Sequence, residues 1–116
     1  MTASFATSEA ESDPSLRPVR AAQRLEEVWT EARNLASELP GWRILEEDPA
    51  TRLLVCERAG SFLAPASRVT LTFEGPEGIP STTVHARAEG PRGLLGLTRH
   101  RARVREFLEL LHRRVG

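Results

Sequence analysis

Cysteine, lysine and tyrosine are nearly or wholly missing from this 116-residue sequence, which has one cysteine, no lysine and no tyrosine. A single cysteine excludes an intramolecular disulfide and a cysteine-based zinc cluster, and it fits a reducing compartment. Cys56 lies in the apolar run 53–56, where thiols usually pack as small, inert hydrophobic groups. We therefore predict no catalytic role for this thiol.

Long apolar runs are also absent. Residues 1–10 carry no positive charge and no apolar run of secretory-signal length, and no segment approaches the roughly 20 apolar residues of a membrane-spanning helix. We expect a cytoplasmic protein. Residues 1–15 are small, polar and acidic, so we predict a flexible tail there and a single domain over residues 16–116.

Catalytic and metal-binding motifs are likewise missing. The three histidines, His85, His100 and His112, have no carboxylate or second histidine at a spacing typical of a metal site, and we expect all three at the surface. A Ser–His–Asp arrangement needs Asp13 or Asp48, which fall in the tail and in a turn. The sequence predicts no catalytic residue, cofactor or metal, and an enzyme of unknown class is only an alternative.

Hydrophobic periodicity is what the sequence does contain. Apolar residues at three- and four-residue spacing predict amphipathic helices over residues 21–39 and about 98–114. Runs bounded by turn residues predict strands at 42–46, 51–58, 67–74 and 81–89. Val69, Leu71 and Phe73 alternate with polar residues, as in a sheet with one buried and one solvent-exposed face. Residues 16–19 are a candidate edge strand.

The predicted fold is α+β with two layers: a helix, a four-stranded antiparallel meander and a second helix, both helices on one face of the sheet. This order is similar to helix-grip and TATA-binding-protein-like folds, which host lipid binding, nucleic-acid binding and catalysis alike. The other face carries Thr70, Thr72, Thr83 and His85. Such a face suits either a monomer or a face-to-face homodimer.

Two connections are apolar where loops are normally polar, at residues 60–65 and 90–97. Strand direction alternates in a meander, so both connections lie at the same end of the sheet. They would bring together the apolar side chains and two arginines that we predict as a ligand or partner site: Phe62, Leu63, Arg87, Arg92, Leu94 and Leu95. Two interpretations are open: a lid over the core, or an apolar mouth rimmed by guanidinium groups.

Charge is balanced overall, with 16 basic and 16 acidic side chains, but residues 91–114 hold seven arginines against two glutamates. A basic helix is a usual footprint of nucleic-acid binding. Glu106 and Glu109 interrupt the run of basic residues along this helix, so we favour a solvated helix face that forms ion pairs with the acidic first helix. The glycine-rich run 90–96 lacks the Gly-Lys-Ser/Thr ending of a phosphate loop.

One family resemblance rests on Trp29, the run 40–44, Asp48 with residues 51–53, and the run 103–108. This layout resembles a bacterial family without assigned activity, domain of unknown function fourteen ninety-nine. The resemblance covers about residues 21–111. Ala66 and Ser67 stand where that family has an acidic pair, and the resemblance implies no activity.

We therefore expect a non-enzymatic binding or interaction domain for a protein, or for an apolar or acidic small molecule such as a lipid. The alternative is nucleic-acid binding through the arginine-rich C-terminal helix.

Overall fold

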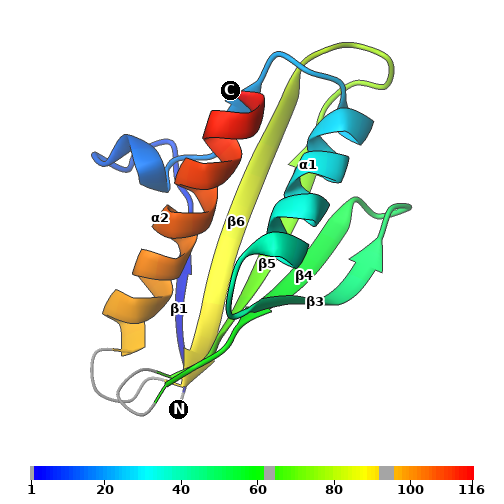
Figure 1. Ribbon diagram of the computed structural model, residues 1–116. Coiled ribbons are helices and arrows are strands. Elements are labelled where there is room, and N and C mark those ends of the chain that lie inside the picture. Colours follow the sequence, from blue (N-terminus) through cyan, green and yellow to red (C-terminus); the bar gives the residue numbers. More distant parts are fainter. Residues whose placement is uncertain (1, 62–64, 92–95) are drawn as a thin grey trace.

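The computed structural model describes residues 2–61, 65–91 and 96–116 (Figure 1). Along the chain, its helices and strands are β1 Thr2–Ala6, the 3-10 helix η1 Pro14–Leu16, β2 Val19–Ala21, α1 Leu25–Glu38, β3 Trp42–Asp48, β4 Leu53–Arg58, β5 Ser67–Glu74, β6 Thr82–Pro91 and α2 Gly96–Val115. The α+β prediction is confirmed, and the four predicted strands correspond to β3 to β6.

The sheet is antiparallel and has six strands rather than the four predicted. Strands β3 to β6 form the expected meander, in the order β6-β5-β4-β3. The two additional strands both pair with β6: β1 opposite residues 87–91 and β2 opposite residues 82–84. Together β1 and β2 act as one edge strand, interrupted by residues 7–18.

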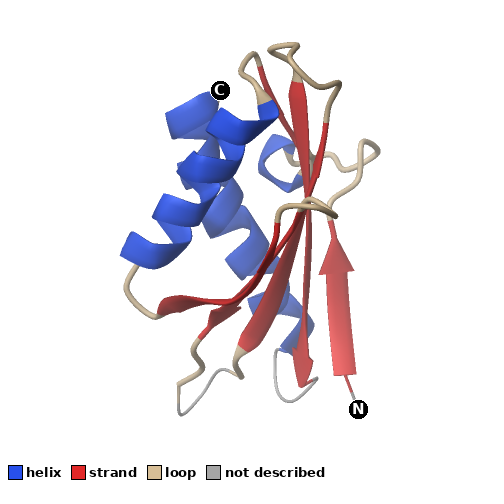
Figure 2. Ribbon diagram, turned by 90° about the vertical axis from the view of Figure 1, so that its right-hand side faces the viewer, coloured by secondary structure: helices blue, strands red, loops and turns tan. Residues whose placement is uncertain are grey.

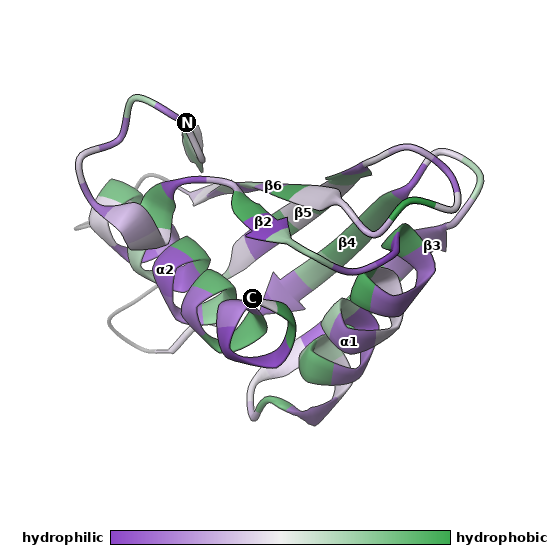
Figure 3. Ribbon diagram, turned by 90° about the horizontal axis from the view of Figure 1, so that it is seen from above, coloured by the Kyte–Doolittle hydropathy of each residue, from purple (hydrophilic) through white to green (hydrophobic). Residues whose placement is uncertain are grey.

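Both helices lie on the same face of the sheet, as predicted (Figures 2 and 3). Apolar residues of α1 and α2 pack against the alternate residues of β4, β5 and β6, such as Val69, Leu71 and Val84, that point to the same side. Two tilted aromatic pairs join the layers, each with ring centroids 5.0 Å apart: Trp29 with Phe73, and Trp42 with Phe107. The core is therefore a single layer between sheet and helices.

The N-terminal segment is ordered against the domain, in contrast to the flexible tail predicted for residues 1–15. Strand β1 pairs with β6, and η1 places Leu16 fully in the core. The predicted edge strand at 16–19 lies at 19–21 instead, beyond Pro18, which has no N–H to donate to a neighbouring strand. Composition alone predicted disorder because it ignores the partners that this segment finds in α2.

Three polar contacts fasten residues 11–15 to α2. Glu11 forms an ion pair with Arg101 at 3.3 Å, and both Nε and Nη2 of Arg105 donate to Asp13 Oδ2 at 3.1 and 2.9 Å. Further along, the Ser15 hydroxyl donates to Glu109 Oε1 at 2.9 Å. Residues two positions apart in this segment thus meet residues one helical turn apart on α2. The contacts run in register along one side of α2.

Candidate functional site

Most of the apolar mouth predicted from the sequence lies outside the described residues. This applies to Phe62, Leu63, Arg92, Leu94 and Leu95. Arg87 is described: it is exposed on β6, between the buried Ala86 and Ala88, and therefore on the sheet face away from the helices. It stands opposite Thr70 of β5 and Ala6 of β1.

The sheet end that adjoins these two connections contains a buried polar network. The Ser67 hydroxyl lies 2.7 Å from His100 Nδ1, and His100 Nε2 lies 3.1 Å from the Pro91 carbonyl oxygen. A carbonyl only accepts, so Nε2 carries a proton, and in the neutral imidazole Nδ1 then accepts from the Ser67 hydroxyl. Arg103 Nη1 donates to the same hydroxyl oxygen at 3.1 Å and to the Pro65 carbonyl at 3.4 Å.

His100 is fully buried, so its predicted place at the surface is wrong. The reason is a gap in the sheet that a glycine leaves. A Cβ on Gly90 would lie 2.6 Å from His100 Cε1 and 2.5 Å from the Ala66 carbonyl oxygen. The imidazole fills the space that any other residue at position 90 would occupy. His85, by contrast, is partly exposed on β6 and lies 3.2 Å from Glu74.

A serine bonded to a histidine is the core of many nucleophilic sites, but this pair is not placed to attack a substrate. Ser67 and His100 are both 0% exposed. The group that orients the imidazole is a neutral carbonyl rather than a carboxylate. Burial, followed by the charge of Arg58, lowers the pKa of Arg103. The network instead fastens the first turns of α2 to β5 and β6.

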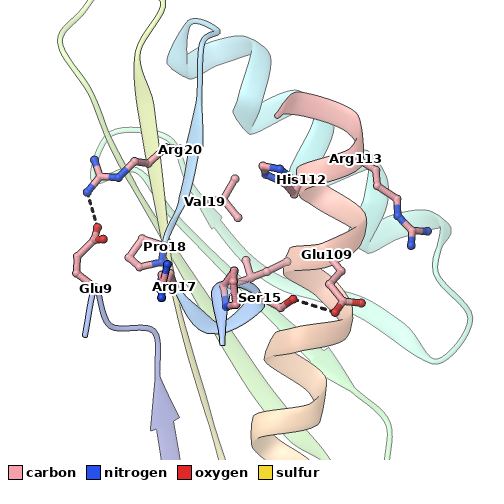
Figure 4. Close-up of a pocket in the computed structure, with 11 residues that line it drawn as sticks. Glu9, Ser15, Arg17, Pro18, Val19, Arg20, Glu109, His112 and Arg113 are labelled. Carbon is pink, nitrogen blue, oxygen red and sulfur yellow. Dashed lines mark hydrogen bonds and ion pairs between the residues drawn. The ribbon is translucent and has the colours of Figure 1, made fainter. Parts of the chain in front are cut away.

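A groove lies elsewhere, between the η1–β2 segment and the C-terminal half of α2 (Figure 4). Its volume is about 510 Å³. The lining residues come from the N-terminal segment and from one side of α2: Glu9, Pro14, Ser15, Arg17, Pro18, Val19, Arg20, Leu108, Glu109, His112 and Arg113.

The floor of the groove is apolar and its walls are charged. Pro18, Val19 and Leu108 are buried residues that form its inner surface, and exposed Pro14 extends it. His112 follows Leu108 by one helical turn, which places it on the same side of α2. Arg113 lies about 140° around the helix axis from Leu108, and its side chain points away from the groove (Figure 4). The ion pairs of residues 11 and 13 with α2 hold the opposite wall in place.

Two arginines of the groove have no carboxylate partner among the described residues. Arg20 is neutralised by an ion pair with Glu9, and Glu109 accepts the Ser15 hydroxyl. Arg17 donates instead to the carbonyls of Glu11 and Ser12, at 2.6 and 3.4 Å. Arg113 is exposed, with no ion pair within residues 2–61, 65–91 and 96–116. The lining therefore has one more arginine than it has glutamates.

Sequence reasoning missed this groove because one of its walls was assigned to a flexible tail. A signal was available in the two-residue spacing of the acids Glu11 and Asp13. Arg101 and Arg105, four residues apart, form the matching cationic row on a helix.

No protein-family model matches the chain, and no curated protein sequence matches it either. The likeness that does appear is one of fold. The chain superposes on CalU16 from Micromonospora echinospora with a TM-score of 0.53 and 15% sequence identity, over 97% of this chain and 86% of that one. The resemblance to domain of unknown function fourteen ninety-nine stays a prediction.

The described residues contain no group of three or more His, Cys, Asp or Glu side chains that could hold a metal ion. No helix within these residues is long and apolar enough to span a membrane.

Proposed function

We propose that this chain is a non-enzymatic binding domain whose groove holds a small ligand with an apolar body and an anionic group. The observation that carries the proposal is the combination of an apolar floor with two arginines, Arg17 and Arg113, that have no carboxylate partner among the described residues. A lipid-like carboxylate has this chemistry.

The size of the groove supports a small-molecule ligand. Pockets for such ligands measure roughly 300 to 1,000 Å³ and are lined mainly by apolar groups with a few polar ones that fix orientation. The groove, at about 510 Å³, falls in that range. Val19 and Leu108 would contact the apolar body. The exposed Arg113 side chain, which points away from the groove in Figure 4, would turn inward to offer paired N–H donors to a carboxylate.

The contacts of α2 argue against the alternative of nucleic-acid binding. Arg101, Arg105 and Arg114 are each ion-paired with acidic side chains of this chain. Arg103 is buried against Ser67. Only one of these ion-paired arginines, Arg114, contacts α1 as the sequence analysis predicted; the other two pair with the N-terminal segment. A helix whose arginines are already engaged has few left to neutralise phosphates.

A ligand series tests the proposal. Decanoate, decanol and acetate separate the contributions of the charge and the apolar body, and binding to the folded state alone must raise the unfolding midpoint. We expect decanoate to raise the midpoint in a saturable manner, decanol to do so weakly, and acetate to have no effect. Equal effects of decanoate and decanol, or no saturable effect of decanoate, would contradict the proposal.

Two matched variants locate the interaction. Arg113→Gln removes a charge from the groove, whereas Arg99→Gln removes an exposed charge from the same helix outside it. A hydrogen bond to a charged group contributes about 1.5 kcal/mol or more, so we expect Arg113→Gln to weaken decanoate binding about tenfold. Arg99→Gln should leave the affinity unchanged. Equal loss in both variants would point to unspecific attraction by positive charge.

A further inference from the structure

The sheet face away from the helices is not covered by α1 or α2 (Figure 3). Its side chains form rows across the four strands of the meander, because antiparallel pairing sets one residue of each strand opposite one of the next. We propose that this face binds a second copy of this chain in a two-fold symmetric dimer. The proposal is independent of the groove, which lies on the helix side of the sheet edge.

The first row alternates in charge. Arg43 of β3 stands opposite Glu57 of β4, Glu57 opposite Arg68 of β5, and Arg68 opposite Glu89 of β6. A two-fold axis parallel to the strands and midway between β4 and β5 reverses this row in the second copy. Arg43 then faces Glu89 of that copy, and Glu57 faces its Arg68. Every residue of the row meets the opposite charge.

The next two rows are complementary at their ends. Each begins with an acid on β3, crosses two uncharged residues and ends with a base or a histidine on β6. They are Glu46, Val55, Thr70 and Arg87 in one row, and Asp48, Leu53, Thr72 and His85 in the other. The same axis sets Glu46 against Arg87 of the second copy, and Asp48 against its His85. One symmetry operation thus satisfies all three rows.

The pattern also has the layout of an interface. Its centre is uncharged: Val55 is buried, and Leu53, Thr70 and Thr72 are half-buried. Charged residues surround this centre, as in interfaces with a dry core and a polar rim. The rim is only partly neutralised within one chain. Arg43 pairs with Glu57 at 3.0 Å, and His85 Nε2 lies 3.2 Å from Glu74 Oε2.

Five rim charges have no ion pair among the described residues: Glu46, Asp48, Arg68, Arg87 and Glu89. Strands lie about 4.8 Å apart and alternate residues about 6.8 Å, so the twelve Cα positions span about 14 by 14 Å. This extent is below that of a standard specific interface and in the range of weak, transient ones. We expect a weak dimer, favoured at low ionic strength because its rim is electrostatic.

The middle row gives the sharpest test. Two packed sheets cross at about −30°, which displaces the outer rows more than the middle one. Within one chain, Glu46 and Arg87 are three strands apart, about 14 Å, and cannot pair with each other. Any effect that couples these two residues must therefore act between chains.

Sedimentation equilibrium at about 20 mM and about 500 mM salt measures the dimer directly. We expect a concentration-dependent dimer at low salt that dissociates at high salt. Arg87→Glu should weaken it at least about tenfold, because symmetry introduces the like-charge contact with Glu46 twice. The double variant Glu46→Arg with Arg87→Glu restores opposite charges and should restore the dimer. Arg99→Glu, on α2, is the control for net charge.

Three outcomes would overturn the proposal. One is a monomer at every concentration in low salt, which leaves the face without a second copy. Another is a dimer that Arg87→Glu does not weaken, which places the contact elsewhere. The third is a double variant as weak as the single one, which excludes the pairing of Glu46 with Arg87. Both residues are exposed, so we expect each variant to remain folded, as circular dichroism can verify.

Discussion

Replacement of Ser67 by alanine removes the hydroxyl group at the centre of the buried polar network. That hydroxyl donates to His100 Nδ1 and accepts from Arg103 Nη1. The substitution leaves the backbone strand intact and deletes one oxygen atom. Two buried polar groups lose a partner at once, and no solvent replaces it because Ser67 and His100 are 0% exposed and Arg103 is 8% exposed.

The magnitude follows from those two losses. A buried donor or acceptor without a partner costs about 1 to 3 kcal/mol. Arg103 keeps its longer bond to the Pro65 carbonyl, 3.4 Å, so its share falls at the lower end. We expect a decrease of about 3 kcal/mol in the free energy of unfolding, which for a domain of this size lowers the midpoint by about 12 °C.

Urea unfolding followed by the fluorescence of Trp29 and Trp42 measures the change. Ser37→Ala is the matched control, since the Ser37 hydroxyl is exposed on α1 and donates only to the Arg33 carbonyl. That substitution should change stability by no more than about 0.5 kcal/mol. If Ser67→Ala costs no more than the control, the network does not hold α2 to the sheet and our account of it is wrong.

Two further predictions concern the N-terminal segment and the lone thiol. Hydrogen bonds from the Ser15 backbone N–H and from Arg105 lower the pKa of Asp13 in the folded protein. The ionised Asp13 carboxylate therefore stabilises the fold fully above the unfolded-state pKa of 3.8, and this stabilisation is lost as the pH falls through the lower pKa of the folded state. Asp13→Asn should lower the unfolding midpoint at pH 7 but not below the folded pKa, and a difference that persists in strong acid would refute the ion pair as its cause. Burial, with the charge of Glu47, raises the pKa of Cys56 to about 12, so the native thiol should resist iodoacetamide at pH 8 and react once the protein is unfolded; rapid alkylation of the native protein would contradict its burial.

Local patterns predicted most of the fold. The alternation of Val69, Leu71 and Phe73 with polar residues identified β5 because side chains of a strand alternate between faces. Helical spacing identified α1 and α2, and the sheet has a single apolar face for both helices to cover. The extra strands β1 and β2 carry weak local signals. Their stability comes from pairing with β6, far along the chain, which no local pattern records.

The candidate groove could not be predicted from local sequence patterns either, because it too depends on contacts between distant parts of the chain. One wall of the groove depends on two ion pairs between residues far apart in the sequence. Glu11 and Arg101 are separated by 90 positions, and Asp13 and Arg105 by 92. The burial of His100 could have been predicted from the sequence, since position 100 continues the apolar stripe of Val104, Phe107 and Leu111. We predicted a surface histidine because the residue that makes room for the imidazole, Gly90, lies on β6 and not on the helix. The predicted loop site at Phe62, Leu63, Arg92, Leu94 and Leu95 lies outside the described residues and stays a prediction.

Chemical-shift mapping of decanoate on the ¹⁵N-labelled protein tests the central claim most directly, because it reports where the ligand binds. The groove predicts saturable shifts gathered in residues 14–20 and 108–113, which Arg113→Gln weakens and Arg99→Gln does not. Shifts gathered instead in residues 60–65 and 90–97 would move the site to the apolar loops, and the absence of saturable shifts would remove the ligand altogether.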